Sequence, residues 1–174
     1  MAPAERVVVV DTRTNLKVLK PSRKKVRRGD MFRMQLPDNT YLFGRVIGTP
    51  EDTDAPLIGP IYFIYIYSYR STTGELPEPG HLSPSALLIA PVFTNRLAWT
   101  DGVFETIWSA MLTDEDKLNQ HCFWTSNPDR YYDEFGNELA ERSEPCALLG
   151  VTSYRTIDDR ISKALGIPPF TGRG

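Results

Sequence analysis

Few side chains in this sequence are of the types that commonly carry catalysis or bind metals. The 174-residue chain has two histidines, His81 and His121, and two cysteines, Cys122 and Cys146. His121 and Cys122 are adjacent, so in a strand their side chains would point to opposite faces and could not form a thiolate–imidazole pair. A zinc site would need all four residues to converge without the paired short spacings of compact structural sites. We therefore predict no metal site and no cofactor.

Carboxylates are plentiful, with 22 Asp and Glu residues, but their spacing selects no pair for acid/base catalysis. The sequence also lacks a G-x-S-x-G nucleophile elbow, a Walker A loop and a G-x-G-x-x-G dinucleotide motif. Because catalytic residues can come from distant positions, a hydrolase with dispersed carboxylates stays open as a third alternative. We predict that the protein is not an enzyme and that none of its residues is catalytic.

Basic side chains concentrate near the start of the chain. Residues 1–30 carry a net charge of +6, and the remainder carries −8 to give the total of −2. The basic stretch 17–28 could neutralise several phosphates in a salt-sensitive way. It has no interleaved aromatic residues for base stacking, which argues against a nucleic-acid partner. We predict a flexible basic arm over residues 1–28, and nucleic-acid binding by an SH3-like barrel through this arm is the alternative function.

A second charged region, residues 114–144, combines acidic and aromatic side chains. It has nine acidic residues against three basic ones, a net of −6. Aromatic side chains among carboxylates are typical of interfaces in which charge steers a basic partner and aromatic residues anchor it. The alternative is a solvated acidic loop whose aromatic residues fill the core. We predict a partner-binding surface made of Trp124, Asp129, Tyr131, Tyr132, Asp133, Glu134, Phe135 and Glu138.

The elements that must position these residues are mainly strands. Residues 31–36 alternate apolar and polar side chains, Pro37-Asp38-Asn39 is a turn sequence, and residues 40–47 fit the returning strand. This pattern predicts a β-hairpin. Gly44 in its second strand predicts a bulge or a close approach of another group to the backbone.

The segment 61–69 is rich in aromatic and β-branched residues and is almost continuously apolar, which predicts a central strand buried on both faces. The segment 104–111 fits a strand and would also fit a short helix. Proline and glycine predict loops over residues 48–60 and 70–84. Further strands or hairpins are predicted over 87–93, 121–125, 131–139 and 148–154.

A helix is predicted at the C-terminus, with Thr156 as N-cap and a stop at Gly166 and Pro168. These elements predict a mainly β (α+β) protein with a bent antiparallel sheet, or an SH3-like, partly open barrel, and a C-terminal helix. We expect a single domain over residues 29–168 and a tail over 169–174.

Targeting signals are not evident in the sequence. The longest apolar stretch near the start is residues 7–10, and no run approaches the roughly 18 apolar residues of a membrane span. The low cysteine content fits a reducing compartment. We therefore expect a cytoplasmic protein without a membrane partner.

The predicted hairpin also carries a recognisable pattern. Gly29-Asp30 precedes an apolar strand ending in Leu36-Pro37-Asp38, and an aromatic residue and Gly44-Arg45-Val46 follow. This pattern resembles the opening hairpin of the bacterial immunity protein 26 family. The similarity extends over residues 26–166 through the apolar strand 61–69, Trp108, the Tyr-Asp-Glu-Phe-Gly segment at 132–136 and the C-terminal helix.

The resemblance implies an antitoxin, that is, an immunity protein that binds and neutralises a cognate bacterial polymorphic toxin by stoichiometric protein–protein interaction. The family brings no catalytic residues. If the toxin is a basic nuclease, the acidic surface would mimic phosphates and occupy its active site. The basic arm and the loop 70–84 go beyond the family pattern, so the resemblance implies nothing about them.

Overall fold

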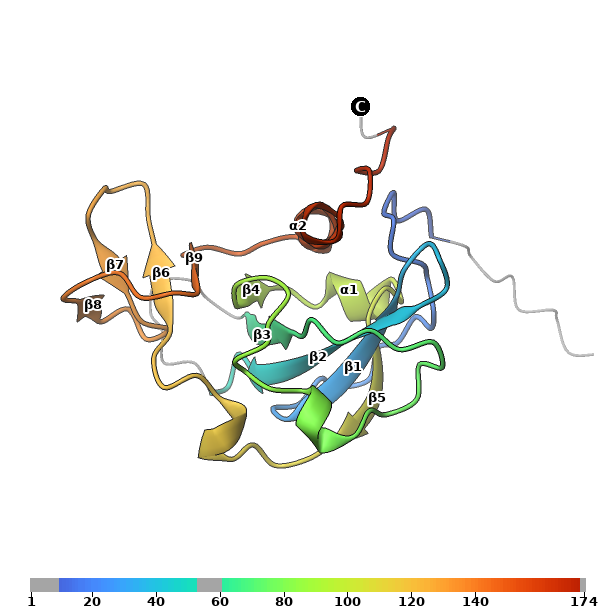
Figure 1. Ribbon diagram of the computed structural model, residues 1–174, viewed down its shortest axis with the longest axis horizontal. Coiled ribbons are helices and arrows are strands. Elements are labelled where there is room, and N and C mark those ends of the chain that lie inside the picture. The colour runs from blue at the N-terminus through green and yellow to red at the C-terminus, as the bar shows by residue number, and fades with distance from the viewer. Residues whose placement is uncertain (1–9, 53–60, 173–174) are drawn as a thin grey trace, which may run out of the picture.

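The computed structural model describes residues 10–52 and 61–172, which form a five-stranded sheet, a four-stranded sheet and a C-terminal helix (Figure 1). The outer parts of the predicted arm and tail, residues 1–9 and 173–174, and part of the predicted loop, residues 53–60, lie outside the described residues. The prediction of a mainly β protein with a C-terminal helix is confirmed. Among the described residues the larger sheet is open, with β4 and β5 at its two edges.

The five-stranded sheet is built on the predicted hairpin and has the order β4-β3-β2-β1-β5. All neighbouring strands pair antiparallel. The segment that fitted either a strand or a short helix is a strand, β5, although most of its side chains are exposed. The strand predicted over 87–93 is shorter and later than expected, since only β4 pairs as a strand there. The strands are β1 (Asp30–Gln35), β2 (Tyr41–Gly48), β3 (Tyr62–Ile66), β4 (Val92–Thr94) and β5 (Glu105–Ser109).

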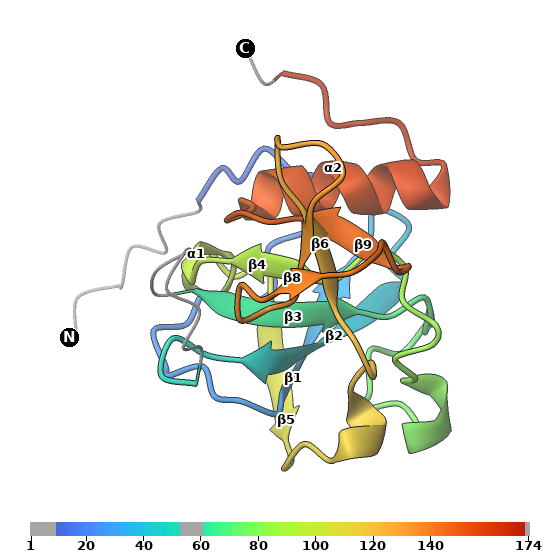
Figure 2. The ribbon, with the colours of Figure 1, turned by 90° about the vertical axis from the view of Figure 1, so that its left-hand side faces the viewer.

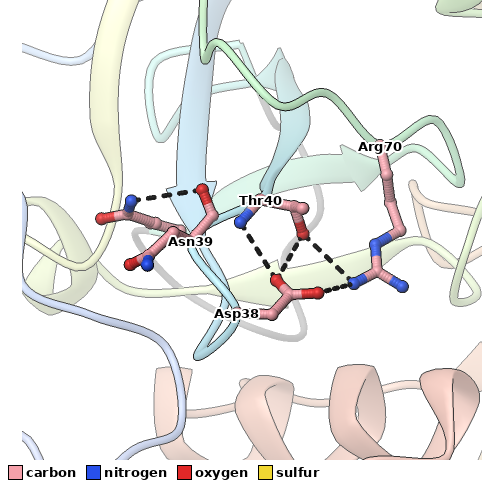
Figure 3. A network of polar contacts seen from close by, with 5 residues as sticks. Asp38, Asn39, Thr40 and Arg70 are labelled. Carbon is pink, nitrogen blue, oxygen red and sulfur yellow. Dashed lines mark hydrogen bonds and ion pairs between the residues drawn. The ribbon is translucent and has the colours of Figure 1, made fainter.

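Side-chain hydrogen bonds close the turn between β1 and β2 (Figure 3). Asn39 has a left-handed φ of 69°, which Asn tolerates better than most residues. The Asp38 carboxylate accepts hydrogen bonds from the Thr40 hydroxyl at 2.6 Å and the Thr40 amide at 3.0 Å. These bonds, with the nearby charge of Arg70, hold the pKa of Asp38 below its usual value. The predicted turn is therefore confirmed, with Asp38 as its organising side chain.

The side chains of β3 alternate between two hydrophobic cores, one on each face of the five-stranded sheet. Ile64 and Ile66 belong to the core that lies under α2 (Tyr154–Leu165). Phe63 and Tyr65 belong to the core that lies under the four-stranded sheet. The prediction of a central strand buried on both faces is confirmed.

The C-terminal helix begins one turn earlier than predicted. Ser153 is the N-cap, and its hydroxyl accepts a hydrogen bond from the Thr156 amide at 3.3 Å, so the assignment of Thr156 as N-cap was wrong. The earlier start carries Tyr154 into the core beside Ile157, and this burial favours the extra turn. The helix ends as predicted at Gly166, whose φ is 70°.

Part of the predicted N-terminal arm lies against this helix and the larger sheet. Leu16 and Val26 are buried in the same core as α2. The Lys17 amide donates to the Gln35 carbonyl at 2.9 Å, and the Leu19 amide donates to the Gly102 carbonyl at 2.8 Å. Residues 16–26 therefore pack against the core and are hydrogen-bonded to the rest of the chain.

Arg45, from the Gly-Arg-Val pattern, ties the chain that follows β5 to the larger sheet. Its buried guanidinium pairs with Asp116 at 3.0 Å and donates to the Ala110 carbonyl at 3.4 Å. The described residues also include three short helical turns. These are η1 (Pro79–His81), α1 (Leu97–Thr100) and η2 (Asp114–Asp116).

Candidate functional site

Most of the residues predicted to bind a partner lie on or beside the four-stranded sheet, which stands in front of the larger sheet in Figure 2. Its order is β8-β7-β6-β9, and the pair β6–β9 is parallel. The predicted hairpin over 131–139 is confirmed. The strand predicted over 148–154 was wrong in its bounds, because the pairing with β6 begins at Cys146 and ends at Leu148. The strands are β6 (Cys122–Trp124), β7 (Tyr131–Tyr132), β8 (Glu138–Leu139) and β9 (Cys146–Leu148).

The inner face of this small sheet is anchored on the larger sheet. Phe123 and Ala147 are opposite each other and both are buried in the second core. The Phe123 ring lies 4.7 Å from the Phe93 ring and 5.8 Å from the Phe63 ring, between centroids. Aromatic packing therefore fixes the position of the small sheet.

The opposite face of the small sheet presents apolar side chains to solvent. Trp124 is in register with Tyr131 on one side and Leu148 on the other, and Tyr131 is in register with Leu139. Residues opposite each other in register share a face of a sheet. Trp124 is 40% exposed and Leu148 is 37% exposed. We call Trp124, Tyr131, Leu139 and Leu148 the outer face.

The acidic tip between β7 and β8 has internal roles. The Asp133 carboxylate accepts hydrogen bonds from the Phe135 and Asn137 amides, both at 2.9 Å. The Glu134 carboxylate lies 3.0 Å from Nδ1 of His121, which is only 4% exposed. The other ring nitrogen of His121 is hydrogen-bonded to the Tyr65 hydroxyl. Glu134 and His121 thus connect the hairpin to β3.

This connection shifts the ionisation of its members. Partial burial disfavours a charged Glu134, but the hydrogen bond and charge of His121 outweigh burial and hold the pKa of Glu134 below its usual value of 4.5. Burial raises the pKa of Tyr65 to about 12, so the hydroxyl stays protonated at neutral pH. These groups are therefore suited to a structural contact between the two sheets.

Glu134→Ala is expected to lower the free energy of unfolding by about 2 kcal/mol, because it leaves a buried His121 nitrogen without its partner. Urea denaturation measures this loss. Glu138→Ala is the matched control, because the ion pair of Glu138 with Arg130 is exposed and long, at 3.8 Å. This substitution should lower the free energy of unfolding by at most about 0.5 kcal/mol. Equal losses in the two variants would contradict the structural role.

The loss caused by Glu134→Ala should also depend on pH. The pKa of Glu134 is lowered on folding, so its stabilisation is complete above its usual value of 4.5 and disappears as pH falls through the lowered value. We therefore expect wild type and Glu134→Ala to converge in stability in acid. A difference that stays constant down to about pH 3 would show that the carboxylate charge does not contribute.

Cys122 and Cys146 are opposite each other in the parallel pair, with their sulfur atoms 2.8 Å apart, and both are free thiols. Burial and the neighbouring Cys122 thiol raise the pKa of Cys146 above its usual value. Because the thiolate is the reactive form, we expect Cys146 to label slowly at neutral pH. In the native protein, the labelling rate of Cys146 should still rise with pH above about pH 9.5. In urea-unfolded protein, the labelling rate should have levelled off by that pH. Labelling at the same rate in native and urea-unfolded protein would contradict this expectation.

The structure brings only some of the predicted site residues together. Trp124 and Tyr131 are neighbours on the outer face, whereas Tyr132 is in register with Phe123 of the inner face. Asp133 and Glu134 make internal bonds at the tip, and exposed Phe135 follows them. The two remaining carboxylates, on Asp129 and Glu138, are exposed.

Sequence reasoning missed three residues at this surface. Leu139 and Leu148 complete the outer face, and the Arg142 guanidinium lies 5.8 Å from the centroid of the Tyr131 ring. Only the hairpin pattern over 131–139 could have indicated Leu139. No local signal indicates Leu148, because a parallel pairing between distant segments places it beside Trp124.

Two features are absent from the part of the chain that the structure describes. No group of three or more His, Cys, Asp or Glu side chains is placed to hold a metal ion there. No helix in residues 10–52 and 61–172 is long and apolar enough to cross a membrane.

The chain matches a model of a known protein family. A family model described as Immunity protein 26 matches residues 27–132, which is more than half of the chain. The matched range contains the larger sheet and continues through β6 and β7. Searches of curated proteins and of solved structures gave no significant match.

Proposed function

Because the chain belongs to the immunity protein 26 family, we propose that it binds and neutralises a cognate bacterial polymorphic toxin in the cytoplasm of the producing cell. Neutralisation by stoichiometric binding needs a tight and specific interface and no chemistry of the inhibitor's own. Such interfaces depend on a few well-packed anchor residues surrounded by contacts that exclude water. We propose that the outer face is this interface.

The observation that supports this location is the exposure of Trp124 between Tyr131 and Leu148. Trp, Tyr and Arg are the residues most enriched among the energetically dominant contacts of protein interfaces. Arg142, stacked near Tyr131, adds a charged group at the border of the apolar patch. The inner face holds the strands in place, so binding would require little ordering of the backbone.

The charges around the outer face favour a basic partner. We propose that exposed Asp129, together with the net charge of −6 over residues 114–144, supplies the field that attracts the toxin, whereas the charge of Glu138 is partly offset by Arg130 at 3.8 Å. Such charges act mainly on the association rate. A toxin of the basic nuclease class fits this arrangement, because carboxylates at the border could occupy positions otherwise taken by phosphates.

The experiment that tests the function is co-expression with the C-terminal domain of the large secreted toxin that we expect a neighbouring gene to encode. We expect the cells to survive and a one-to-one complex to co-purify. The complex should persist as salt is raised, because its core is apolar, whereas phosphate binding would weaken steeply. Cell death without a complex, with the toxin domain shown to be active, would contradict the proposal.

A further inference from the structure

A cavity of about 500 Å³ lies between the basic N-terminal segment and the edge strand β5. In Figure 1, β5 and the small sheet are at opposite ends of the molecule. The cavity is therefore separate from the outer face, and its volume is in the range of small-molecule sites. Its lining comes from six residues between Lys20 and Arg27, from Asp30 on β1, from Trp99 on α1 and from three residues of β5.

The basic wall of this cavity is held in place by the domain. The Ser22 amide donates to the Trp99 carbonyl at 2.9 Å, and Arg96 donates to the Lys24 carbonyl. Val26, which also lines the cavity, is buried in the main core. These contacts give the wall a defined backbone, which a ligand site requires.

The cavity has an excess of positive charge. Of its two carboxylates, Glu105 pairs with Arg33 at 2.8 Å, whereas buried Asp30 accepts the Arg27 amide at 2.8 Å and makes no ion pair with a described residue. Lys25 pairs with Glu51 at 3.1 Å. The other three cations of the lining make no ion pair with any described residue. They are Lys20, Lys24 and Arg27.

One buried polar atom of the lining residue Trp99 lacks a partner in the described part of the chain. Trp99 lines the cavity and is almost completely buried, and its indole Nε1 has no hydrogen-bond acceptor among the described residues. A buried donor without a partner costs about 1–3 kcal/mol, and native structures rarely keep one without a reason. Because Nε1 itself is buried, an acceptor atom of a ligand in the cavity would satisfy it only after the lining shifts.

We propose that this cavity binds a small organic phosphate, such as a nucleotide, with its phosphate groups among Lys20, Lys24 and Arg27. Three cations without an ion pair, set against the one unpaired carboxylate of Asp30, leave an excess of two positive charges, which matches a ligand with more than one negative charge better than a single carboxylate. The volume is much larger than inorganic phosphate needs, so the ligand also has an organic part. A nucleic-acid strand would need a continuous groove with exposed aromatic residues, and Trp99 is the only aromatic residue that the described part of the chain contributes to the lining.

The test is calorimetric titration of the full chain with ATP, pyrophosphate, adenosine, citrate and a single-stranded oligonucleotide. We expect ATP to bind at one site and pyrophosphate to bind more weakly, whereas adenosine and citrate should not bind measurably. In proton–nitrogen NMR spectra, the Trp99 indole signal should shift on addition of ATP. No binding of either phosphate compound at about 1 mM would overturn the proposal.

Matched variants separate the cavity from the general charge of the segment. Lys24→Ala with Arg27→Ala removes two lining cations and should weaken ATP binding at least about 10-fold. Arg23→Ala with Arg28→Ala removes the same charge from positions outside the lining and should change it less than about 2-fold. All four side chains are exposed, so the variants should fold, which thermal denaturation checks. Equal losses in the two variants, or binding of the oligonucleotide alone, would overturn the proposal in favour of an extended electrostatic surface.

Discussion

Trp124→Ala is expected to weaken binding of the toxin domain at least about 30-fold, which corresponds to about 2 kcal/mol or more. The indole is the largest side chain of the outer face, and Tyr131 and Leu148 flank it in register. Its removal would leave a void at the centre of the proposed interface. Because Trp124 is 40% exposed in the free protein, the fold should lose far less than binding does. Calorimetry with the purified toxin domain measures the loss of binding, and cell survival on co-expression measures the loss of protection.

Trp108→Ala is the matched control for this experiment. Trp108 is 49% exposed, but it lies on β5 at the far edge of the larger sheet. We expect this variant to bind the toxin domain as wild type does. If Trp108→Ala weakens binding and Trp124→Ala does not, the outer face is not the interface, although the immunity function would stand.

Gly44→Ala is expected to lower the free energy of unfolding by about 3 kcal/mol. A Cβ atom at this position would overlap the Phe32 ring and lie 2.7 Å from the Tyr65 carbonyl oxygen. The ring cannot move aside easily, because it stacks on Phe104 at 4.5 Å and meets the edge of Trp99 at 5.3 Å, between centroids. The backbone of β3 is equally constrained by pairing on both sides. Urea denaturation measures the loss.

Gly150→Ala is the control for Gly44→Ala, because a Cβ atom at Gly150 has no heavy atom within 4 Å. This substitution should change the free energy of unfolding by less than about 0.5 kcal/mol. Phe32→Leu should recover part of the loss when it is combined with Gly44→Ala, since the smaller side chain gives the added methyl group room. Losses that simply add in the double variant would show that the clash with Phe32 is not the cause.

Local patterns in the sequence were sufficient for the parts of the fold that short-range chemistry controls. Pro37-Asp38-Asn39 predicted the turn, because these residues favour its backbone angles and Asp38 can cap it. Gly44 predicted a close approach of another group to the backbone. This is confirmed, because the Phe32 ring and the Tyr65 carbonyl oxygen leave no room for a Cβ atom at this position. The apolar run around β3 predicted burial on both faces, since no side of such a strand can face water without cost.

The tertiary structure decided which residues of the acidic region lie on the outer face. The sequence grouped Tyr132 and Glu134 with Trp124, but the pairing of β6 with β7 turns Tyr132 to the other face, and His121 engages Glu134. Leu148 reaches the outer face through a parallel pairing with β6. The cavity beside β5 likewise exists only because residues 16–26 pack onto the domain. The pairing of β6 with β7 is local, but its register and the other two contacts depend on how the small sheet and residues 16–26 pack onto the core, which no local pattern of residues encodes.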